Sequence, residues 1–389
     1  MMKKKMVANT CTELFYQMIR SVIGTSDERL ENPLPEVWKG LYEMTQQQSL
    51  LGILFYGIEK HPEMRPPREL LLKWYAVSEQ IRRANEKTNR VAVELSDYFR
   101  SQGFRSCILK GQGNTLNYPD SYIRTSGDID VWLSPISLPQ GEEVTRRNDK
   151  GKKLSVDENV KEVLAFVRKQ VGQTKMCYHH VDFKAVDGIE VEVHYRPSFM
   201  NNLIHNSRLQ KWFEKNADEQ FSHEVELPDG AGKICVPTDA FNRIYQLAHI
   251  NQHVINGGIG LRQIIDYYLV LKQEMTDEER VHDERLLKHL GLYKVASALM
   301  WVLKETLGLD EKYWLVAPNE KVGQFLLEEI MLSGNFGQYD QRVKHGASPW
   351  EKNLQRLQRD WRLMWYFPSE CLWEPIFRWY HFFWRLAHR

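Results

Sequence analysis

The stretch Arg124-Thr-Ser-Gly-Asp-Ile-Asp-Val-Trp-Leu133 predicts a half-buried β-strand with two carboxylates on one face. Polar and apolar side chains alternate from Asp128 onward, which is the period of two expected of a strand. Because side chains alternate across a sheet, Asp128 and Asp130 project from the same face. Two like charges held this close repel each other, so the pair favours a cation between them. Oxygen ligands of this kind suit Mg²⁺, which shares its remaining positions with water and substrate phosphates.

A second acidic strand is predicted downstream, in Gly188-Ile-Glu-Val-Glu-Val-His194. Glu190, Glu192 and His194 share one face of this strand, while apolar residues occupy the other. We predict that Glu192 supplies a third carboxylate to the site. The alternative for all the carboxylates is a solvated sheet face without a metal, because acidic residues are mostly exposed in proteins.

The pattern of apolar residues changes twice along the 389-residue chain, which is long enough for two or three domains. Helical spacing dominates residues 1–103, short strands appear in residues 104–236, and helical spacing returns in residues 237–389. We therefore predict an α+β fold, in which a small mixed β-sheet core is flanked by N-terminal and C-terminal helical regions. Asp187-Gly188 predicts a hairpin turn, and residues 138–157 predict a polar surface insertion.

Composition and charge indicate a protein that neither spans a membrane nor wraps nucleic acid. Lys and Arg number 52 against 51 Asp and Glu, so the basic excess of a nucleic-acid-wrapping chain is missing. The 5 cysteines form no CxxC pair, which suits a reducing compartment and indicates no disulfide framework. No apolar run approaches the ~20 residues of a transmembrane helix. We expect a cytoplasmic location.

Three pieces of sequence together resemble the signature of the DNA polymerase beta-like nucleotidyltransferase superfamily. These pieces are Leu109-Lys-Gly111, Tyr118-Pro119 and the stretch from Arg124 to Asp130. Within that superfamily, the chain looks most like a bacterial branch known as the uncharacterised nucleotidyltransferase family. This branch is similar again at Val191-Glu-Val-His194 and in the helical segment from Pro237 to Asp266.

The resemblance implies transfer of a nucleoside monophosphate from a nucleoside triphosphate to an acceptor hydroxyl, with Mg²⁺ or Mn²⁺ as cofactor. Asp128, Asp130 and Glu192 would be the catalytic residues and the metal ligands, and Glu192 would also help to deprotonate the acceptor. The nucleotide-binding residues implied are Lys110, Gly111, Arg124, Ser126 and Gly127. A small molecule, a protein side chain and an RNA end all remain open as the acceptor.

The glycine motif departs from the superfamily pattern. The superfamily usually carries Gly-Ser or Gly-Gly shortly before its carboxylate pair. This chain has Lys110-Gly-Gln-Gly113 and a longer gap before Asp128. The alternative function is therefore a catalytically silent nucleotide-binding or regulatory module with the same fold.

Two polar pairs are predicted on the helices that follow Pro237. His249 and His253 stand one helical turn apart, a spacing that can bind zinc, although packing or hydrogen bonding near the cleft is favoured. Arg262 and Asp266 have the spacing of an ordinary surface ion pair, which is favoured over a role in lining the substrate cleft.

The segment from Pro375 to Arg389 is rich in aromatic and basic residues and predicts an amphipathic helix. Its apolar face comprises Ile376, Phe377, Tyr380, Phe383, Trp384 and Ala387. Such a face can cover the core of its own domain, which is the favoured role. The alternatives are contact with a membrane surface or with a groove of a partner protein.

Overall fold

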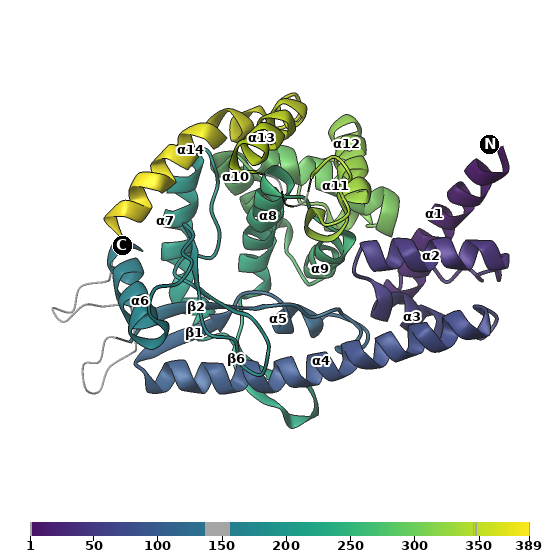
Figure 1. Cartoon of the computed structure of the whole chain (residues 1–389), viewed down its shortest axis with the longest axis horizontal. Coiled ribbons are helices and arrows are strands. Elements are labelled where there is room, and N and C mark those ends of the chain that lie inside the picture. Colours follow the sequence, from purple (N-terminus) through teal and green to yellow (C-terminus); the bar gives the residue numbers. More distant parts are fainter. Residues whose placement is uncertain (1, 137–155, 345, 347, 389) are drawn as a thin grey trace.

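The computed structural model describes residues 2–136, 156–344, 346 and 348–388. Helices from both ends of the chain surround a small β-sheet, which confirms the predicted α+β class (Figure 1). Most of the insertion predicted at residues 138–157 lies outside the described residues.

The central part of the chain forms the sheet and the elements that connect its strands. These are β1 (Phe104–Ile108), α5 (Gln112–Thr115), β2 (Ile129–Pro135), α6 (Val156–Val171), β3 (His180–Asp182), β4 (Val191–His194), α7 (Leu203–Gln220), β5 (Glu224–Leu227), η1 (Pro228–Gly230) and β6 (Gly232–Cys235). The strand order of the main sheet is β1-β2-β4-β3, and β5 pairs with β6 in a separate two-stranded sheet. In the main sheet β2 and β4 run parallel while the other two pairs are antiparallel, so the sheet is mixed as predicted.

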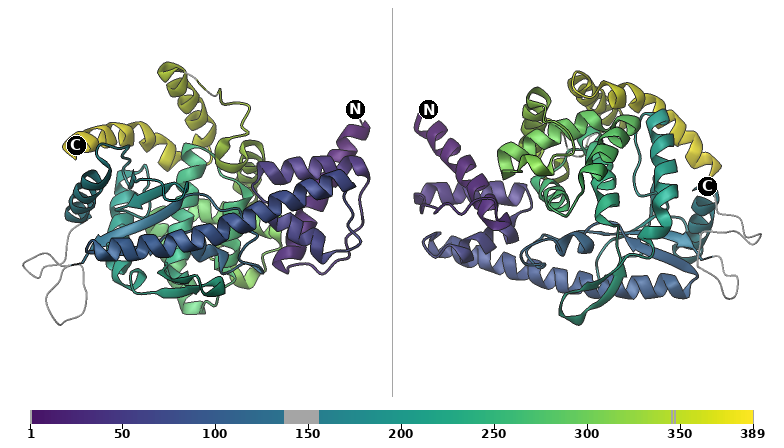
Figure 2. Two further views of the ribbon diagram at one scale, coloured as in Figure 1. Left: turned by 60° about the horizontal axis from the view of Figure 1, so that its bottom comes forward. Right: turned by 180° about the vertical axis from the view of Figure 1, so that it is seen from behind.

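Helices make up the two flanking parts. The N-terminal helices are α1 (Met2–Ile23), α2 (Pro35–Gln47), α3 (Leu51–Lys60) and α4 (Arg68–Ser101). The C-terminal helices are α8 (Asp239–Asn256), α9 (Leu261–Leu271), α10 (Asp277–Leu290), α11 (Tyr293–Leu307), η2 (Glu311–Tyr313), α12 (Glu320–Ser333), η3 (Asn335–Gly337), α13 (Pro349–Met364) and α14 (Pro368–Ala387). The long helix α4 runs along one edge of the molecule, and α13 and α14 lie along the opposite edge (Figures 1 and 2).

The turn between β3 and β4 has the geometry that its sequence predicts. Asp187 and Gly188 have φ angles of 52° and 76°. Both residues are therefore left-handed, as a two-residue hairpin turn of this type requires. The backbones of Val186 and Ile189 exchange hydrogen bonds of 3.0 and 2.9 Å across the turn. This hairpin places β3 beside β4 and so brings the histidines of β3 to the acidic strand.

Both faces of the main sheet are covered. On one face, Val131 and Val193 join a core cluster with apolar residues of α4 and α6. On the other face, Trp132 is 1% exposed and packs against Phe221 and Phe241, with ring centroids 4.7 and 6.0 Å away. Asp130 shares the face of Trp132 because the two residues alternate along β2. Helices therefore cover the face that carries Asp130, and this part of the sheet is not solvated.

The C-terminal helix α14 divides its aromatic residues between core and surface. Phe377 and Trp384 are buried in the core cluster on the sheet. These two residues therefore cover the core of their own protein, as the favoured prediction for this helix expected. Ile376 and Phe383, from the same predicted apolar face, are 49% and 60% exposed. Contact of these exposed residues with a membrane surface or a partner stays a prediction. Among the helices of the described chain, none combines the length and apolarity needed to cross a membrane.

The predicted domain boundaries after residues 103 and 236 fall between elements. α4 ends at Ser101 just before the first boundary, and α8 begins at Asp239 just after the second. The larger core cluster nevertheless includes apolar residues from all three predicted regions. The division into three domains therefore stays a proposal.

Candidate functional site

The register of two parallel strands brings the predicted carboxylates together. Asp130 of β2 is the direct neighbour of Glu192 of β4. Registered residues of adjacent strands project from the same face of a sheet, so these two side chains lie on the same side. Glu190 precedes β4 and is exposed. The strand therefore presents Glu192, rather than Glu190, to Asp130.

Asp130 is buried between two cationic groups. It is 3% exposed, and its Oδ2 atom lies 3.2 Å from Lys110 Nζ. His194 Nε2 donates a hydrogen bond of 2.9 Å to its Oδ1 atom. Burial by itself would raise the pKa of this carboxyl, but Lys110 and the hydrogen bond from His194 hold the pKa below its usual range. Asp130 is therefore ionised throughout the physiological pH range.

His194 carries a proton on both ring nitrogens. Its Nδ1 atom lies 3.3 Å from the carbonyl oxygen of Arg196, and its Nε2 atom faces the carboxylates. An imidazole that faces acceptors with both nitrogens is an imidazolium. Burial lowers the pKa of His194, but the hydrogen bonds to Asp130 and Glu192 outweigh burial and raise it to about 9. His194 is thus a charged hydrogen-bond donor that holds Asp130 in position.

Asp128 is the carboxylate whose negative charge is least compensated. Repulsion from Asp130 and then burial raise its pKa to about 6, while Lys110 opposes this shift. A carboxyl group that resists ionisation for this reason would be relieved by a bound cation, which screens the two negative charges from each other. This electrostatic imbalance fits the divalent metal that the sequence analysis placed here.

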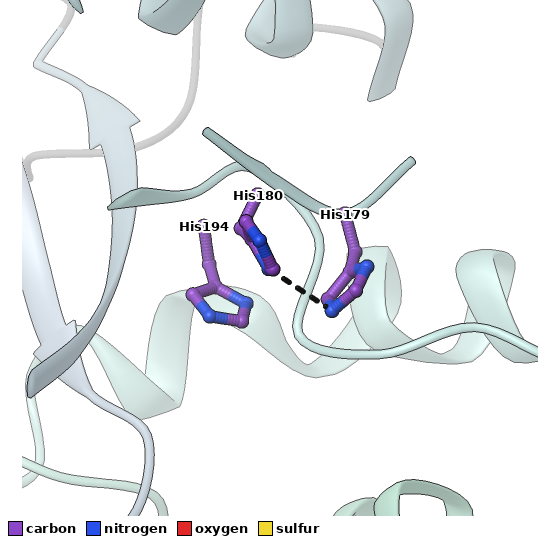
Figure 3. Close-up of side chains that lie close together, drawn as sticks. All are labelled: His179, His180 and His194. Atoms are coloured by element: carbon purple, nitrogen blue, oxygen red, sulfur yellow. Dashed lines mark hydrogen bonds between the residues drawn. The ribbon is translucent and has the colours of Figure 1, made fainter. Parts of the chain in front are cut away.

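Three buried imidazoles, those of His179, His180 and His194, lie close together near Glu192, and Figure 3 shows their arrangement. His180 Nδ1 lies 3.1 Å from Glu192 Oε2 and 3.2 Å from His179 Nε2. In the described chain, three groups of side chains bring possible metal-binding atoms within 4.8 Å of one another, and Asp128 belongs to none of them. The groups are His179–His180–His194, Asp130–Glu192–His194 and His180–Asp182–Glu192.

Sequence reasoning gave these histidines no role. The alternation along β4 placed His194 on the same face as Glu192. That pattern alone would have justified a role for His194 in the site. His179 and His180 reach the site only because β3 pairs with β4, with His180 opposite His194. That pairing is a tertiary contact, and no local pattern in the sequence announces it.

A small cavity opens beside the carboxylates, and we name it the carboxylate cavity. Asp128 and Asp130 line it together with Lys110, Gly111, Asn114, Arg124, Gly127, Tyr245, Gln246, His249, Ile250, Arg262, Gln263, Asp266 and Phe336. Of the predicted nucleotide-binding residues, only Ser126 is outside this lining. The carboxylate cavity has a volume of about 30 Å³, which is enough for a water molecule or an ion.

Lys110 and Gly111 enter the carboxylate cavity at the end of β1. Burial lowers the pKa of Lys110, but Asp130, Asp128 and Glu192 outweigh it and raise the pKa above its usual value, so the amine stays charged. Gly111 has a φ of 65° and no atom within 4 Å of the position that a Cβ would take. This open, left-handed backbone is accessible to a ligand and suits glycine alone.

Arg124 and Asp266 form a buried ion pair, which corrects the prediction for Asp266. The sequence analysis favoured a surface pair between Arg262 and Asp266, but these residues are 6% and 4% exposed. Arg124 donates to both carboxylate oxygens of Asp266 at 2.8 and 2.7 Å. The hydroxyl of Tyr118 donates to the same carboxylate at 2.8 Å. The i,i+4 pattern failed because the helix α9 is buried along its whole length.

Arg262 is the cation of the carboxylate cavity without a carboxylate partner. Its Nη1 atom donates a hydrogen bond of 2.6 Å to the carbonyl oxygen of Thr125. In the described chain no carboxylate lies within ion-pair distance of the Arg262 guanidinium. Burial, and then the nearby Arg124, lower its pKa to about 10. A buried guanidinium with spare donors beside Gly127 is suited to an anionic ligand. The sequence analysis favoured an ion pair for Arg262 and kept a role in lining the substrate cleft as the second option, and Arg262 does line the carboxylate cavity.

His249 and His253 lie within hydrogen-bond distance of each other near the cleft. Hydrogen bonding was the role favoured over zinc binding for this pair. The two Nε2 atoms lie 2.9 Å apart, and His249 Nε2 lies 3.1 Å from Lys110 Nζ. Because a ring nitrogen has a single lone pair, Lys110 and His253 compete as donors to His249 Nε2. Neither histidine belongs to a convergent group of metal-binding side chains in the described chain. The pair therefore extends the polar chain that runs from His180 through Glu192, His194, Asp130 and Lys110.

The comparison with known proteins identifies the class of protein. A family model described as "Uncharacterised nucleotidyltransferase" matches residues 35–308, which is well over half of the chain. The class that fold, carboxylates and match define together is that of the nucleotidyltransferases. More particularly, the chain belongs to the uncharacterised nucleotidyltransferase family, as its Lys-Gly and Ser-Gly-Asp-Ile-Asp motifs predicted. No curated protein and no solved structure matches the chain significantly.

Proposed function

We propose that this protein transfers a nucleoside monophosphate from a nucleoside triphosphate to an acceptor hydroxyl, with the help of a divalent cation. The observation that carries the proposal is the strand register in which Glu192 is the neighbour of Asp130, together with the charge repulsion between Asp130 and Asp128. Membership of a nucleotidyltransferase family supports the reaction class. The arrangement offers carboxylate ligands for a cation and positive charge for phosphates within one cavity.

Asp128, Asp130 and Glu192 would hold the cation. A bound divalent ion would stabilise the attacking and leaving oxygens of an in-line displacement at phosphorus. Carboxylate oxygens suit both Mg²⁺ and Mn²⁺, the two cofactors predicted from the sequence. We assign His194 to positioning, because it uses Nε2 to donate to Asp130 and faces a carbonyl oxygen with Nδ1.

The remaining residues of the carboxylate cavity would bind and orient the triphosphate. Lys110 and Arg262 supply positive charge, and the backbone at Gly111 is open to close approach. Glu192, whose side chain is 29% exposed, is the carboxylate placed to receive the proton of the acceptor hydroxyl. Arg124 acts differently from the sequence prediction in this proposal, because its guanidinium is committed to Asp266.

Transfer of label from an α-³²P-labelled nucleoside triphosphate to components of a cell extract would test the proposed function. We expect label to move in the presence of Mg²⁺ or Mn²⁺, and to stay on the nucleotide with Asp128→Asn. Glu192→Gln should slow turnover far more than it weakens nucleotide binding, because its contribution arises in the transition state. Glu190→Gln is the matched control, since this neighbouring glutamate is exposed and should leave transfer unchanged.

The same samples separate an enzyme from a silent binding module. A ligand that binds only the folded state stabilises it by about 2.7 kcal/mol at a hundredfold excess over Kd. A metal-dependent rise in melting temperature without transfer to any acceptor would favour the regulatory module. If neither a thermal shift nor transfer occurs with any of the four common triphosphates, the proposed function is wrong.

Metal binding should depend on pH through Asp128. Because the pKa of this carboxyl is raised to about 6, it is protonated below that pH and must lose its proton when a cation binds. The affinity for Mn²⁺ should therefore fall about tenfold per pH unit below pH 6 and change little above it. Calorimetry between pH 5 and 8, in buffers of different ionisation enthalpy, would measure the affinity and the proton release together. An affinity that shows no break near pH 6 would contradict the role of Asp128.

A further inference from the structure

A second and larger cavity lies next to the carboxylate cavity, and we name it the α13 cavity. It has a volume of about 320 Å³ and is lined by the C-terminal end of α8, by α12, by η3 and by α13. This volume lies in the range of small-molecule sites, which is roughly 300–1,000 Å³. Phe336 lines both cavities, so the two cavities adjoin at this residue.

The loop that carries Phe336 is tightly held. Phe336 has a φ of 53°, a left-handed conformation that is rare for a large side chain. The neighbouring Gly337 packs so closely that a Cβ would lie 2.1 Å from the carbonyl oxygen of Gly257. The ring of Phe336 contacts the ring of His253 at 5.2 Å and the guanidinium of Arg262 at 5.7 Å. The residue at which the two cavities adjoin thus stands on a constrained backbone.

Positive charge dominates the lining of the α13 cavity, which includes five cationic and two anionic side chains. The two carboxylates, Glu329 and Asp340, are occupied by two of the arginines. Arg342 binds Glu329 and Asp340 at 2.8 Å each, and Arg362 binds Glu329 at 3.0 Å. These four residues form a neutral network, in which the other three cations take no part. Burial lowers the pKa of Arg359, while the charges of Asp360 and Glu374 oppose that shift.

The three remaining cations lie on one face of α13. Lys352, Arg356 and Arg359 follow the spacing of i, i+4 and i+7, which places them along one side of a helix. Among the described residues, no carboxylate lies within ion-pair distance of any of the three. Arg359 donates to the carbonyl oxygen of Asn256, but its Nε atom is buried without a hydrogen-bond partner. Such an unmet donor beside two free cations is suited to an anion that enters the cavity.

We propose that the α13 cavity binds the acceptor, and that this acceptor is a small molecule carrying a phosphate group in addition to its hydroxyl. The phosphate would lie against Lys352, Arg356 and Arg359, and the hydroxyl would point past Phe336 toward the carboxylates. The acceptor role rests on the proposed function, whereas the binding of phosphate does not. A volume of about 320 Å³ suits a small molecule.

The reaction balances with Glu192, the neighbour of Asp130 on β4, as the proton acceptor. The hydroxyl oxygen of the acceptor forms a bond to the α-phosphorus, while the bond from that phosphorus to the oxygen bridging to the β-phosphate breaks. Pyrophosphate leaves with the electron pair of the broken bond, and the proton of the hydroxyl passes to Glu192. The product is a diester that joins the nucleoside monophosphate to the phosphorylated acceptor.

The position of the α13 cavity relative to the family match supports a role in acceptor choice. The match ends at residue 308, so it includes the carboxylates and α8 but neither α12 nor α13. The cations of α13 therefore lie outside the part that this chain shares with its family. If members of the family carry out the same transfer on different acceptors, we expect the transfer site to lie within the matched part and the acceptor site to lie outside it.

Calorimetry with inorganic phosphate would test the anion site in the full chain. Wild type should bind phosphate, and Lys352→Gln/Arg356→Gln should weaken binding by about tenfold or more, because it removes two charge-assisted contacts. The matched control is Arg285→Gln/Lys321→Gln, which removes two exposed cations outside the cavity and should change the affinity less than about twofold.

A second measurement separates the acceptor from the phosphates of the nucleotide itself. If the acceptor occupies the α13 cavity, the α13 double variant should raise the KM for the acceptor at least about tenfold and leave the KM for the nucleotide unchanged. A matching loss of nucleotide affinity would mean that the triphosphate occupies the cavity, and would overturn the proposal. Absence of phosphate binding, or an equal loss in the matched control, would also overturn it. Phosphate binding that persists while no transfer occurs would reject the acceptor role and leave an anion site.

Discussion

Asp130→Asn should destabilise the metal-free protein by about 3–5 kcal/mol, because it removes one partner from a buried ionic cluster. Lys110 and His194 would keep their positive charges with no carboxylate at the centre of the cluster. Asp128→Asn should have the opposite effect and stabilise the metal-free protein at neutral pH. It removes a carboxylate that repels Asp130 and leaves the cationic contacts of Asp130 in place.

The effect of Asp128 on stability should depend on pH. Its pKa in the folded protein is raised to about 6 from an ordinary value of 3.8, so the folded state binds its proton more tightly than the unfolded state. The contribution of this group to stability therefore falls as the pH rises through that window, by about 3 kcal/mol. Asp128→Asn should consequently stabilise the protein at pH 8 and have little effect below pH 4.

Urea unfolding in the presence of a chelator would measure both variants, at pH 8 and pH 4. The free energy of unfolding should fall for Asp130→Asn and rise for Asp128→Asn at pH 8. If the free energy of unfolding changes in the same direction for both variants, Asp128 and Asp130 have equivalent environments. That result would contradict the arrangement in the structure. Both variants should still bind Mn²⁺ more weakly than wild type, because each one removes a proposed ligand.

Asp266→Asn should lower the free energy of unfolding by about 3–5 kcal/mol, the loss expected when one partner of a buried ion pair is removed. Arg124 and Asp266 are 5% and 4% exposed in their side chains, so water cannot solvate the guanidinium that remains. The hydroxyl of Tyr118 would also lose its charged acceptor. Because this pair links the segment before β2 to α9, transfer activity should fall with stability.

The matched control for this prediction is Asp120→Asn. Asp120 also pairs with an arginine, with 2.6 Å between its Oδ2 atom and Arg82 Nη2, but the two side chains are 21% and 41% exposed. An ion pair of this exposure contributes about 0.2–1 kcal/mol. Unfolding in urea would compare the two variants directly. If Asp266→Asn destabilises no more than Asp120→Asn, the buried pair does not hold this part of the site together.

The sequence by itself determined the fold class, the family and the core of the proposed site. The alternation from Asp128 to Leu133 and the alternation around Glu192 predicted the two strands, because side-chain period is a local property of the backbone. Asp187-Gly188 predicted the hairpin in the same way, since the turn depends on two left-handed residues. The Lys-Gly and Ser-Gly-Asp-Ile-Asp pieces identified the family because they are contiguous motifs.

Only the tertiary structure decided how the polar residues are partnered. Asp128 and Asp130 look equivalent in the sequence, yet Asp130 lies between Lys110 and His194 while Asp128 faces mainly repulsion. Arg124 and Asp266 are 142 residues apart, and the spacing within α9 favoured a different partner for Asp266. The α13 cavity likewise joins the end of α8 to helices far along the chain. Charges act through space and burial, so their partners follow from how the helices pack over the sheet rather than from position in the chain.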